Sequence, residues 1–279
     1  MHLQADDFNL EATLDSGQVF GFKKHDDKVY EGVIAGRPVR LWQTQNRLYT
    51  DNGFPQERLI HFFDLDRDLS SVYRILKEEN IYAACKKIMG LRLIRQDPWE
   101  ALACFILSSN NNVKRIQGIW KNLSEYYCGG GSRLPAGEAG TAPTAFPTAS
   151  QIASSHERIL RQLGLGYRAP FLQYTAQFVS QNLKYLEWVR EADYGEAKAR
   201  VLALPGIGEK VADCVLLYGF QKYEAFPVDV WILRVMRKLY FRNRKVSDKK
   251  IHEFAQKKWG DKAGYVQQYL FHGARSGIL

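Results

Sequence analysis

The sequence predicts an α+β protein in which a small N-terminal antiparallel β-sheet domain precedes a mostly α-helical region. Short runs rich in β-branched and aromatic residues, separated by turn residues, occupy residues 29–50. Apolar residues then recur at helical spacing from residue 59 almost to the end of the chain. With 279 residues and 46% hydrophobic content the chain can bury two cores, and we expect domains at 1–96 and 97–279.

The predicted sheet contains three antiparallel strands, at residues 29–34, 39–43 and 47–50. Ahead of them, Gly17 lies in a polar turn, where the backbone either approaches a partner closely or simply reverses direction. Residues 59–69 and 71–89 show helical periodicity, and Asn80 interrupts the second segment.

Asp97 followed by Pro98 predicts the start of a helix that continues to about Leu107. The polar run 108–112 separates it from a second helix, although a simple connection needs fewer residues. The run is either an Asn-rich turn or a set of amide groups suited to base edges. Residues 128–148, rich in Gly, Pro, Ala and Ser, are predicted as a surface loop without chemistry.

A glycine-flexed turn at residues 163–168 presents an aromatic residue, Tyr167, and a cation, Arg168. The ring is suited to enter a duplex as a wedge, and the guanidinium is suited to read a base edge. Alternatively, Tyr167 only anchors the loop.

Residues 204–208, Leu-Pro-Gly-Ile-Gly, are predicted as a tight connection inside an interhelical hairpin at about 196–220. Gly206 and Gly208 leave backbone N–H groups uncovered at the start of the second helix, where the helix dipole is positive. A phosphate group can dock at such a position.

Lys210 lies in the first turn of that second helix, where the dipole disfavours an ammonium and favours the neutral, nucleophilic amine. Asp229 stands at the N-cap position of a helix beginning at Val230. The spacing is compatible with a reactive pair and also with a solvated lysine and a purely structural cap.

The formal charge of +9 and the isoelectric point near 9.3 favour a polyanionic partner. Residues 234–262 hold eleven Lys and Arg residues, which indicates a phosphate-tracking surface or a generic solvated face. The four cysteines are widely separated, so we expect no disulfide framework, no metal site and no cofactor. Cys104 and Cys214 fall in apolar helical patterns as core residues; alternatively, Cys214 belongs to a pocket one turn after Lys210.

No segment of the sequence approaches about 18 uninterrupted apolar residues, and the N-terminus lacks the form of a secretion signal. We therefore expect an intracellular monomer that does not bind membranes. Its compartment would be the cytoplasm or nucleoid of a bacterium or archaeon, or the nucleus of a eukaryote.

Residues 204–214 with 226–229 closely resemble the helix-hairpin-helix, Gly/Pro-rich loop and aspartate signature of base-excision DNA glycosylases. Further segments resemble the 8-oxoguanine DNA glycosylase/AP lyases in the family's order and nearly end to end: residues 16–18, 108–115, 163–168 and 263–271. The resemblance implies a sheet domain attached to two helical subdomains. It also implies double-stranded DNA containing an oxidised purine as partner, with the damaged base flipped into a pocket between the subdomains.

The resemblance implies roles for single residues. Lys210 matches the family's nucleophile and Asp229 its catalytic carboxylate, so attack at the anomeric carbon, base loss and β-elimination of the 3′ phosphate are expected without a cofactor. Gly17 matches the residue whose carbonyl senses the N7 hydrogen of 8-oxoguanine. The other matches are Cys214, Gln267 and Phe271 around the flipped base, Asn110 in the vacated stack, Tyr167 as wedge, and Arg115 with Arg168 on the orphaned cytosine.

The chain departs from the family at Trp231, where the best-known members carry histidine, so a phosphate contact or pocket gating there is not carried over. Two alternatives remain. A helix-hairpin-helix glycosylase for another lesion is disfavoured because many such relatives have a C-terminal four-cysteine iron–sulfur motif, and no cysteine follows Cys214. The presence of both Lys210 and Asp229 argues against a non-catalytic DNA-binding module.

Overall fold

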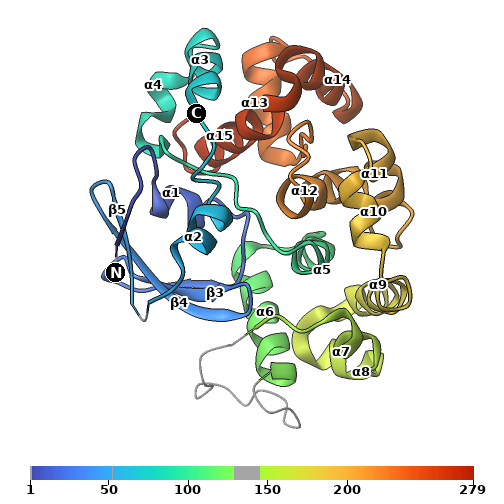
Figure 1. Cartoon of the computed structure of the whole chain (residues 1–279). Helices are drawn as coiled ribbons and strands as arrows, with labels where there is room; N and C mark the ends of the chain where they lie inside the picture. Colours follow the sequence, from blue (N-terminus) through green and yellow to red (C-terminus); the bar gives the residue numbers. More distant parts are fainter. Residues whose placement is uncertain (1, 52, 129–144) are drawn as a thin grey trace.

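The computed structural model describes residues 2–51, 53–128 and 145–279, and it sets an antiparallel sheet beside a larger group of helices (Figure 1). Most of the predicted surface loop at 128–148 lies outside the described residues. The sheet order is β1-β5-β4-β3-β2, and neighbouring strands are antiparallel. The strands are β1 (His2–Gln4), β2 (Phe22–Lys24), β3 (Tyr30–Ile34), β4 (Arg37–Thr44) and β5 (Arg47–Thr50).

The three central strands confirm the predicted ones, with ends that differ by at most two residues. The sequence patterns did not predict β1 and β2, which are the two edge strands and have three residues each. Strands this short carry too few alternating positions to show a period of two. Tyr30, Leu41 and Leu48 are fully buried under the sheet, which fixes its register because a shift by one residue would expose them.

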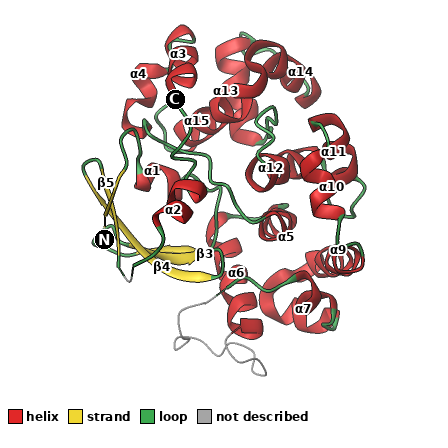
Figure 2. Cartoon of the chain, in the orientation of Figure 1, coloured by secondary structure: helices red, strands yellow, loops and turns green. Residues whose placement is uncertain are grey.

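Helices make up most of the remaining described chain (Figure 2). They are α1 (Leu10–Leu14), α2 (Gln56–Phe62), α3 (Ser70–Glu78), α4 (Tyr82–Cys85), α5 (Pro98–Ser108), α6 (Val113–Cys128), α7 (Ala149–Ala153), α8 (Glu157–Leu160), α9 (Ala169–Gln181), α10 (Tyr185–Glu191), α11 (Tyr194–Leu202), α12 (Glu209–Phe220), α13 (Val230–Tyr240), α14 (Asp248–Trp259) and α15 (Ala263–Arg275). Shorter turns are η1 (Lys86–Ile88), η2 (Arg161–Leu165), η3 (Gly166–Arg168) and η4 (Gly260–Lys262).

Helix α5 is the centre of the helical region. The predicted cap is confirmed, because the Asp97 carboxylate accepts a hydrogen bond from the Glu100 N–H at 3.0 Å and Pro98 begins the helix. Residues 101–107 are all buried, and α5 packs along α12 (Figure 1). A helix that is apolar on all sides lies inside a core, so α5 is a core helix against which α12 packs.

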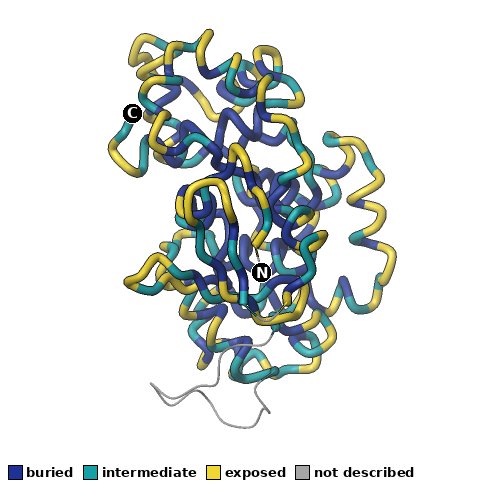
Figure 3. Tube along the Cα trace, turned by 60° about the vertical axis from the view of Figure 1, so that its left-hand side comes forward, coloured by how far each residue is buried: buried dark blue, intermediate teal, exposed yellow. Residues whose placement is uncertain are grey.

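The buried apolar residues fall into two clusters. One lies under the sheet and contains residues from Ala5 to Phe63 together with Ile94; the other fills the helical region. Helices α3 and α4 contribute Val72, Leu76 and Cys85 to the helical cluster, although they precede α5 in the chain. Figure 3 shows buried segments in the middle of the molecule and exposed residues on its outer turns.

A buried carboxylate, Asp64, joins the two parts. Its oxygens accept hydrogen bonds from Arg67 at 2.7 Å, from Arg95 and from the hydroxyl of Tyr265 on α15. Tyr223 adds a hydroxyl contact at 3.5 Å. Because these partners come from distant segments, Asp64 ties the sheet domain to the C-terminal helices.

Candidate active site

The structure forms the predicted hairpin between α11 and α12. Gly206 has a φ of +79°, and a Cβ there would lie 2.6 Å from the Phe171 ring, so this position requires glycine. Gly208 is the N-cap of α12, is exposed and supplies no side-chain cap. The first N–H groups of this twelve-residue helix therefore face outward with the positive end of its dipole, which is an arrangement that binds anions.

Lys210 is the second residue of α12 and is half-buried. Its ammonium lies 5.7 Å from the centre of the Phe105 ring on α5. Phe105 in turn stacks on Tyr218, with ring centres 5.2 Å apart. Among the described residues, no carboxylate lies within ion-pairing distance of Lys210. The Lys210 amine therefore faces an aromatic ring and has no salt bridge in the described chain, so it is free to react.

Asp229 is the N-cap of α13, as predicted. Its carboxylate accepts hydrogen bonds from the Trp231 N–H at 3.0 Å and the Ile232 N–H at 2.8 Å. Burial raises the pKa of Asp229 above the ordinary value, while these two hydrogen bonds and the charge of Lys210 oppose that rise. Asp229 is therefore a structural cap that also lies in the field of Lys210.

Cys214 follows Lys210 by one helical turn and is buried. Burial raises the pKa of the Cys214 thiol to about 11, against the lowering effect of the nearby Lys210 charge. The thiol is therefore neutral at physiological pH. The core and pocket interpretations of Cys214 are compatible, because a buried side chain can still line a site.

Gln267, on α15, is 3% exposed and lies against the segment that leads into Asp229. Its Nε2 donates a hydrogen bond to the Pro227 carbonyl at 3.0 Å, while its Oε1 is buried and has no hydrogen-bond partner among the described residues. Such an orphaned acceptor is uncommon in folded proteins and suits a ligand that donates hydrogen bonds. Phe271 follows one turn later on the same helix and is partly buried.

Gly17 occupies a turn that buried side chains hold in place. Gln18 is fully buried, accepts a hydrogen bond from the Ile94 N–H at 2.7 Å and donates to the Arg92 carbonyl at 2.8 Å. Gln268 of α15 donates to the Ser16 carbonyl at 3.5 Å. Gly17 itself has a φ of +83°, a backbone conformation that glycine adopts without strain, and it lies beside Arg275 of α15.

The polar run 108–112 is an exposed turn between α5 and α6. Asn110 is exposed at a φ of 51°, a left-handed conformation that Asn tolerates better than most residues. The Asn112 side chain caps α6 by accepting a hydrogen bond from the Arg115 N–H at 3.0 Å. Arg115 is exposed on the first turn of that helix. The two interpretations of residues 108–112 are therefore compatible, because the run forms a turn and also presents the amide of Asn110 at the surface.

Tyr167 and Arg168 both hold this turn. The Tyr167 hydroxyl donates to the Ser109 carbonyl at 3.1 Å, although its side chain is 49% exposed. Arg168 is 2% exposed, and its guanidinium donates to the carbonyls of Ser109 and Asn110 at 2.6–2.9 Å. Val113, the first residue of α6, lies between the 108–112 turn and the Gly17 turn. Its Cγ2 is 3.6 Å from where a Cβ on Gly17 would stand.

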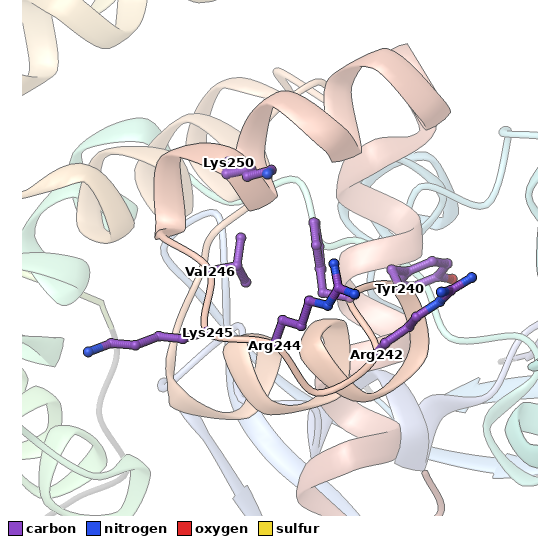
Figure 4. Close-up of a pocket in the computed structure, with 7 residues that line it drawn as sticks. Tyr240, Arg242, Arg244, Lys245, Val246 and Lys250 are labelled. Atoms are coloured by element: carbon purple, nitrogen blue, oxygen red, sulfur yellow. The ribbon is translucent and has the colours of Figure 1, made fainter.

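The basic segment 234–262 forms α13, α14 and the loop between them. A cavity of about 280 Å³ in that loop is lined by Tyr240, Phe241, Arg242, Arg244, Lys245, Val246 and Lys250 (Figure 4). Within the described residues, the four cations of this cavity have no ion-pair partner, and Lys245 points away from the others (Figure 4). Unpaired cations at this density favour the phosphate-tracking interpretation.

Trp231 is 36% exposed beside Asp229, and its ring lies 5.6 Å from the Arg234 guanidinium. A larger cavity of about 860 Å³ lies between the sheet and helices α2, α7 and α9. Neither cavity includes Lys210, Asp229 or Gln267 in its lining. Lys210, Cys214 and Asp229 nevertheless interact electrostatically with one another.

Sequence patterns missed two residues of the site, Gln268 and Arg275. Gln268 accepts a hydrogen bond from the Tyr218 hydroxyl at 2.6 Å and holds the Gly17 turn. Arg275 lies against Gly17 and Phe271. The spacing of Arg275 could have indicated its place in the site, because Gln267, Phe271 and Arg275 follow one another at intervals of four residues along one helix face.

In the described part of the chain, no helix combines the length and the apolar character needed to cross a membrane.

Two family models match successive parts of the chain. Residues 1–102 match the family model described as the N-terminal domain of 8-oxoguanine DNA glycosylase, and residues 103–261 match that of the HhH-GPD superfamily of base excision DNA repair proteins. A probable N-glycosylase/DNA lyase of Methanothermobacter thermautotrophicus is 32% identical, over 100% of this chain and 97% of the relative.

Solved structures are similar over nearly the whole chain. The Clostridium acetobutylicum 8-oxoguanine glycosylase/lyase, bound to duplex DNA with cytosine opposite 8-oxoguanine, has a TM-score of 0.87 at 29% identity and covers 100% of this chain and 99% of its own. MBOgg1, bound to a low-affinity DNA ligand, has a TM-score of 0.89 at 31% identity, over 99% and 95%. The chain therefore belongs to the 8-oxoguanine DNA glycosylase family, within the HhH-GPD superfamily of base excision DNA repair proteins.

Proposed function

We propose that this protein excises 8-oxoguanine from duplex DNA, preferentially opposite cytosine, through a Schiff base formed by Lys210. As a member of its family it is a DNA N-glycosylase and lyase; the substrate and the mechanism are the proposed part. The observation that carries the proposal is that Lys210, without an ion pair in the described chain, interacts electrostatically with the partly buried Asp229. The orphaned acceptor of Gln267 belongs to a side chain that is bonded to Pro227, two residues before Asp229.

The chemistry follows from the pair at the helix starts. The Lys210 amine attacks the anomeric carbon of the flipped nucleotide, and the base leaves with the bonding electrons of its glycosidic bond. Asp229 stabilises the positive charge that develops on the sugar, and the buried setting strengthens this effect. The resulting imine acidifies the neighbouring sugar proton, whose loss expels the 3′ phosphate.

The recognition residues fit a guanine-type base. Guanine presents N–H donors on its pairing edge, and the orphaned Oε1 of Gln267 is an acceptor for them. Phe271 and the neutral thiol of Cys214 offer apolar faces for the ring. The carbonyl of Gly17 is proposed to accept the N7 hydrogen that 8-oxoguanine has and guanine lacks.

The remaining residues are proposed to hold the DNA. The helix start at Gly206 and Gly208 binds a phosphate, and the cations of the α13–α14 loop extend this contact. Asn110 fills the vacated stack, Tyr167 is the wedge, and Arg115 with Arg168 holds the orphaned cytosine. One chain carries all of these groups, so we expect a monomer to act on double-stranded DNA.

Borohydride trapping tests the proposal. The wild type should form a covalent adduct with 8-oxoguanine DNA after reduction, because the imine becomes a stable amine. Lys210→Gln should bind the same DNA but show neither base release nor an adduct. Lys23→Gln is the matched control, since it removes an exposed lysine of the sheet domain. Base release by Lys210→Gln at the wild-type rate would remove Lys210 as the nucleophile.

A further inference from the structure

Arg275, the last residue of α15, shares a helix face with two proposed recognition residues. It follows Phe271 by four residues and Gln267 by eight, and such spacing places side chains above one another. Long side chains on a helix lean toward its N-terminus, so Arg275 is directed back over Phe271. The guanidinium carbon lies 5.5 Å from the centre of the Phe271 ring.

The same guanidinium lies directly on the Gly17 turn. Its Nη1 is 2.5 Å from where a Cβ on Gly17 would stand, and its Nη2 donates a hydrogen bond to the Asp15 carbonyl. Only a glycine allows this approach, because any side chain at position 17 would displace Arg275. Gly17 and Arg275 are thus fitted to each other.

The guanidinium is under-partnered for its position. It has five N–H donors, yet within the described chain its hydrogen-bond acceptor is the Asp15 carbonyl, and no carboxylate lies within ion-pairing distance. By contrast, the structural arginine Arg92 donates to three backbone carbonyls. Arg275 is only partly buried, so its remaining donors are accessible to an acceptor from outside the chain.

Arg275 interacts electrostatically with Asp229. Burial lowers the pKa of Arg275, whereas the charges of Asp15 and Asp229 oppose that change. The guanidinium is therefore within the field of the carboxylate that is proposed to act in catalysis. A cation near the leaving base also stabilises negative charge that the base acquires as it departs.

We propose that Arg275 is a base-recognition residue that donates hydrogen bonds to a carbonyl oxygen of the flipped purine beside N7. This inference rests on the proposed excision of 8-oxoguanine. In 8-oxoguanine the N7 hydrogen lies between the carbonyl oxygens O6 and O8. If the Gly17 carbonyl accepts that hydrogen, a guanidinium packed on Gly17 faces one of these two oxygens.

An acceptor and a donor side by side read this edge more strictly than either alone. The Gly17 carbonyl accepts from N7–H, and Arg275 donates to the neighbouring oxygen. If that oxygen is O8, guanine lacks both matching groups. If it is O6, the arginine selects against an adenine-type base, whose amino group at that position is a donor.

Equilibrium binding in a Lys210→Gln background tests the role without chemistry. The duplexes carry 8-oxoguanine, guanine, 8-oxoadenine or a tetrahydrofuran abasic analogue opposite cytosine. Adding Arg275→Met should weaken binding to the 8-oxoguanine duplex by at least about tenfold, the value of one good base contact. The loss on the abasic analogue should be at least several times smaller, since that DNA offers no base. A similar loss on 8-oxoadenine assigns the contact to O8, whereas a loss on 8-oxoguanine and guanine but not on 8-oxoadenine assigns it to O6.

Two further variants guard the interpretation. Arg47→Met removes one exposed guanidinium from β5 of the sheet domain and should change binding to all duplexes equally and little. Arg275→Lys keeps the charge but not the planar pair of donors, so it should recover only part of the loss. It also carries the test if Arg275→Met does not fold, which the thermal midpoint reports.

Equal losses on the lesion and abasic duplexes, or full recovery by Arg275→Lys, would overturn the proposal, because both results mean that only the charge matters. If Lys210→Gln alone shows no preference for 8-oxoguanine over guanine, the proposed function fails and the inference fails with it. If that preference exists and survives in Arg275→Met, only the role of Arg275 is withdrawn.

Discussion

Asp213, on α12, and Asp229, at the start of α13, are both withdrawn from solvent but have different partners. Asp213 is 1% exposed and its oxygens are occupied by the Tyr194 hydroxyl at 2.6 Å, by Lys198 at 3.0 Å and by His252. Asp229 accepts two backbone N–H groups and has no ion pair within the described chain. The oxygens of Asp213 are occupied by side chains, including the cation of Lys198, whereas the charge of Asp229 has no cationic partner in direct contact in the described chain.

Cations of this protein also differ in whether they have a carboxylate partner. Lys198 is paired with Asp213 and Glu209, and Arg95 with Asp64 and Asp66. Lys210 and Arg275 have no such partners in the described residues. Saturated charges hold elements together, whereas unsaturated charges near a binding site cost stability and are suited to chemistry.

The largest expected effect is on stability, at Asp213. Asp213→Asn should lower the free energy of unfolding by about 3–5 kcal/mol, because Lys198 and His252 lose a buried partner. Denaturant titration measures the change. Glu209→Gln is the matched control: it also contacts Lys198, but its side chain is 70% exposed, so a loss below about 1 kcal/mol is expected. Similar losses in both variants would refute the distinction.

Replacing Asp229 should affect activity more than stability. Asp229→Asn should slow single-turnover base excision by about 10²–10³-fold while the protein stays folded, because Asn also caps helices. Asp193→Asn, at the N-cap of α11, is the control for the cap alone and should leave excision unchanged. A folding defect in Asp229→Asn with normal activity per folded molecule would instead make Asp229 purely structural.

The pH dependence of Asp229 has a definite sign. Its pKa in the folded protein is raised, so the folded state binds the proton more tightly than the unfolded chain. Stability therefore declines as pH rises from the ordinary Asp pKa to the raised one. The excision rate should fall as pH drops through that raised value, because the ionised carboxylate is lost. A rate that stays flat from pH 7 down to the ordinary Asp range would contradict the proposed role.

A smaller effect concerns the opposite base, where the two arginines differ in exposure. Arg115→Ala should reduce the preference for excision opposite cytosine over adenine by about tenfold, because a surface guanidinium loses one base contact. Arg168→Ala should also slow excision opposite every base, since its guanidinium holds Ser109 and Asn110. Single-turnover rates against all four bases measure both. Equal effects of the two variants would contradict this division.

The smallest effect is at Glu100, a partly buried acid that belongs to neither group of charges. Burial raises the pKa of Glu100 to about 7, Asp97 adds to this, and the hydrogen bond from the Trp120 indole at 2.8 Å opposes it. A raised folded pKa means that stability is lost as pH rises from about 4.5 to about 7. Glu100→Gln should therefore stabilise the protein at pH 8 by about 1 kcal/mol more than at about pH 6.2. Thermal midpoints at the two pH values check this.

Local signals accounted for much of the fold. The Asp97 cap, the central strands and the glycine hairpin depend on residues close in sequence, which is why their patterns predicted them. Partnerships between distant residues leave no such pattern. The burial of Arg168 on the turn near Ser109 spans almost 60 positions, and the contact of Arg275 with Asp15 spans 260. Neither could be predicted from spacing.

The Asp64 junction makes local opening of the molecule costly for the site. Asp64 holds Tyr265, which lies two residues before Gln267 on α15. Partial unfolding of the sheet domain would therefore release the helix that carries the proposed recognition residues. Amide protons of β4 and α15 should exchange with solvent through one cooperative opening, with similar free energies, so that thermal unfolding of the sheet domain also removes activity.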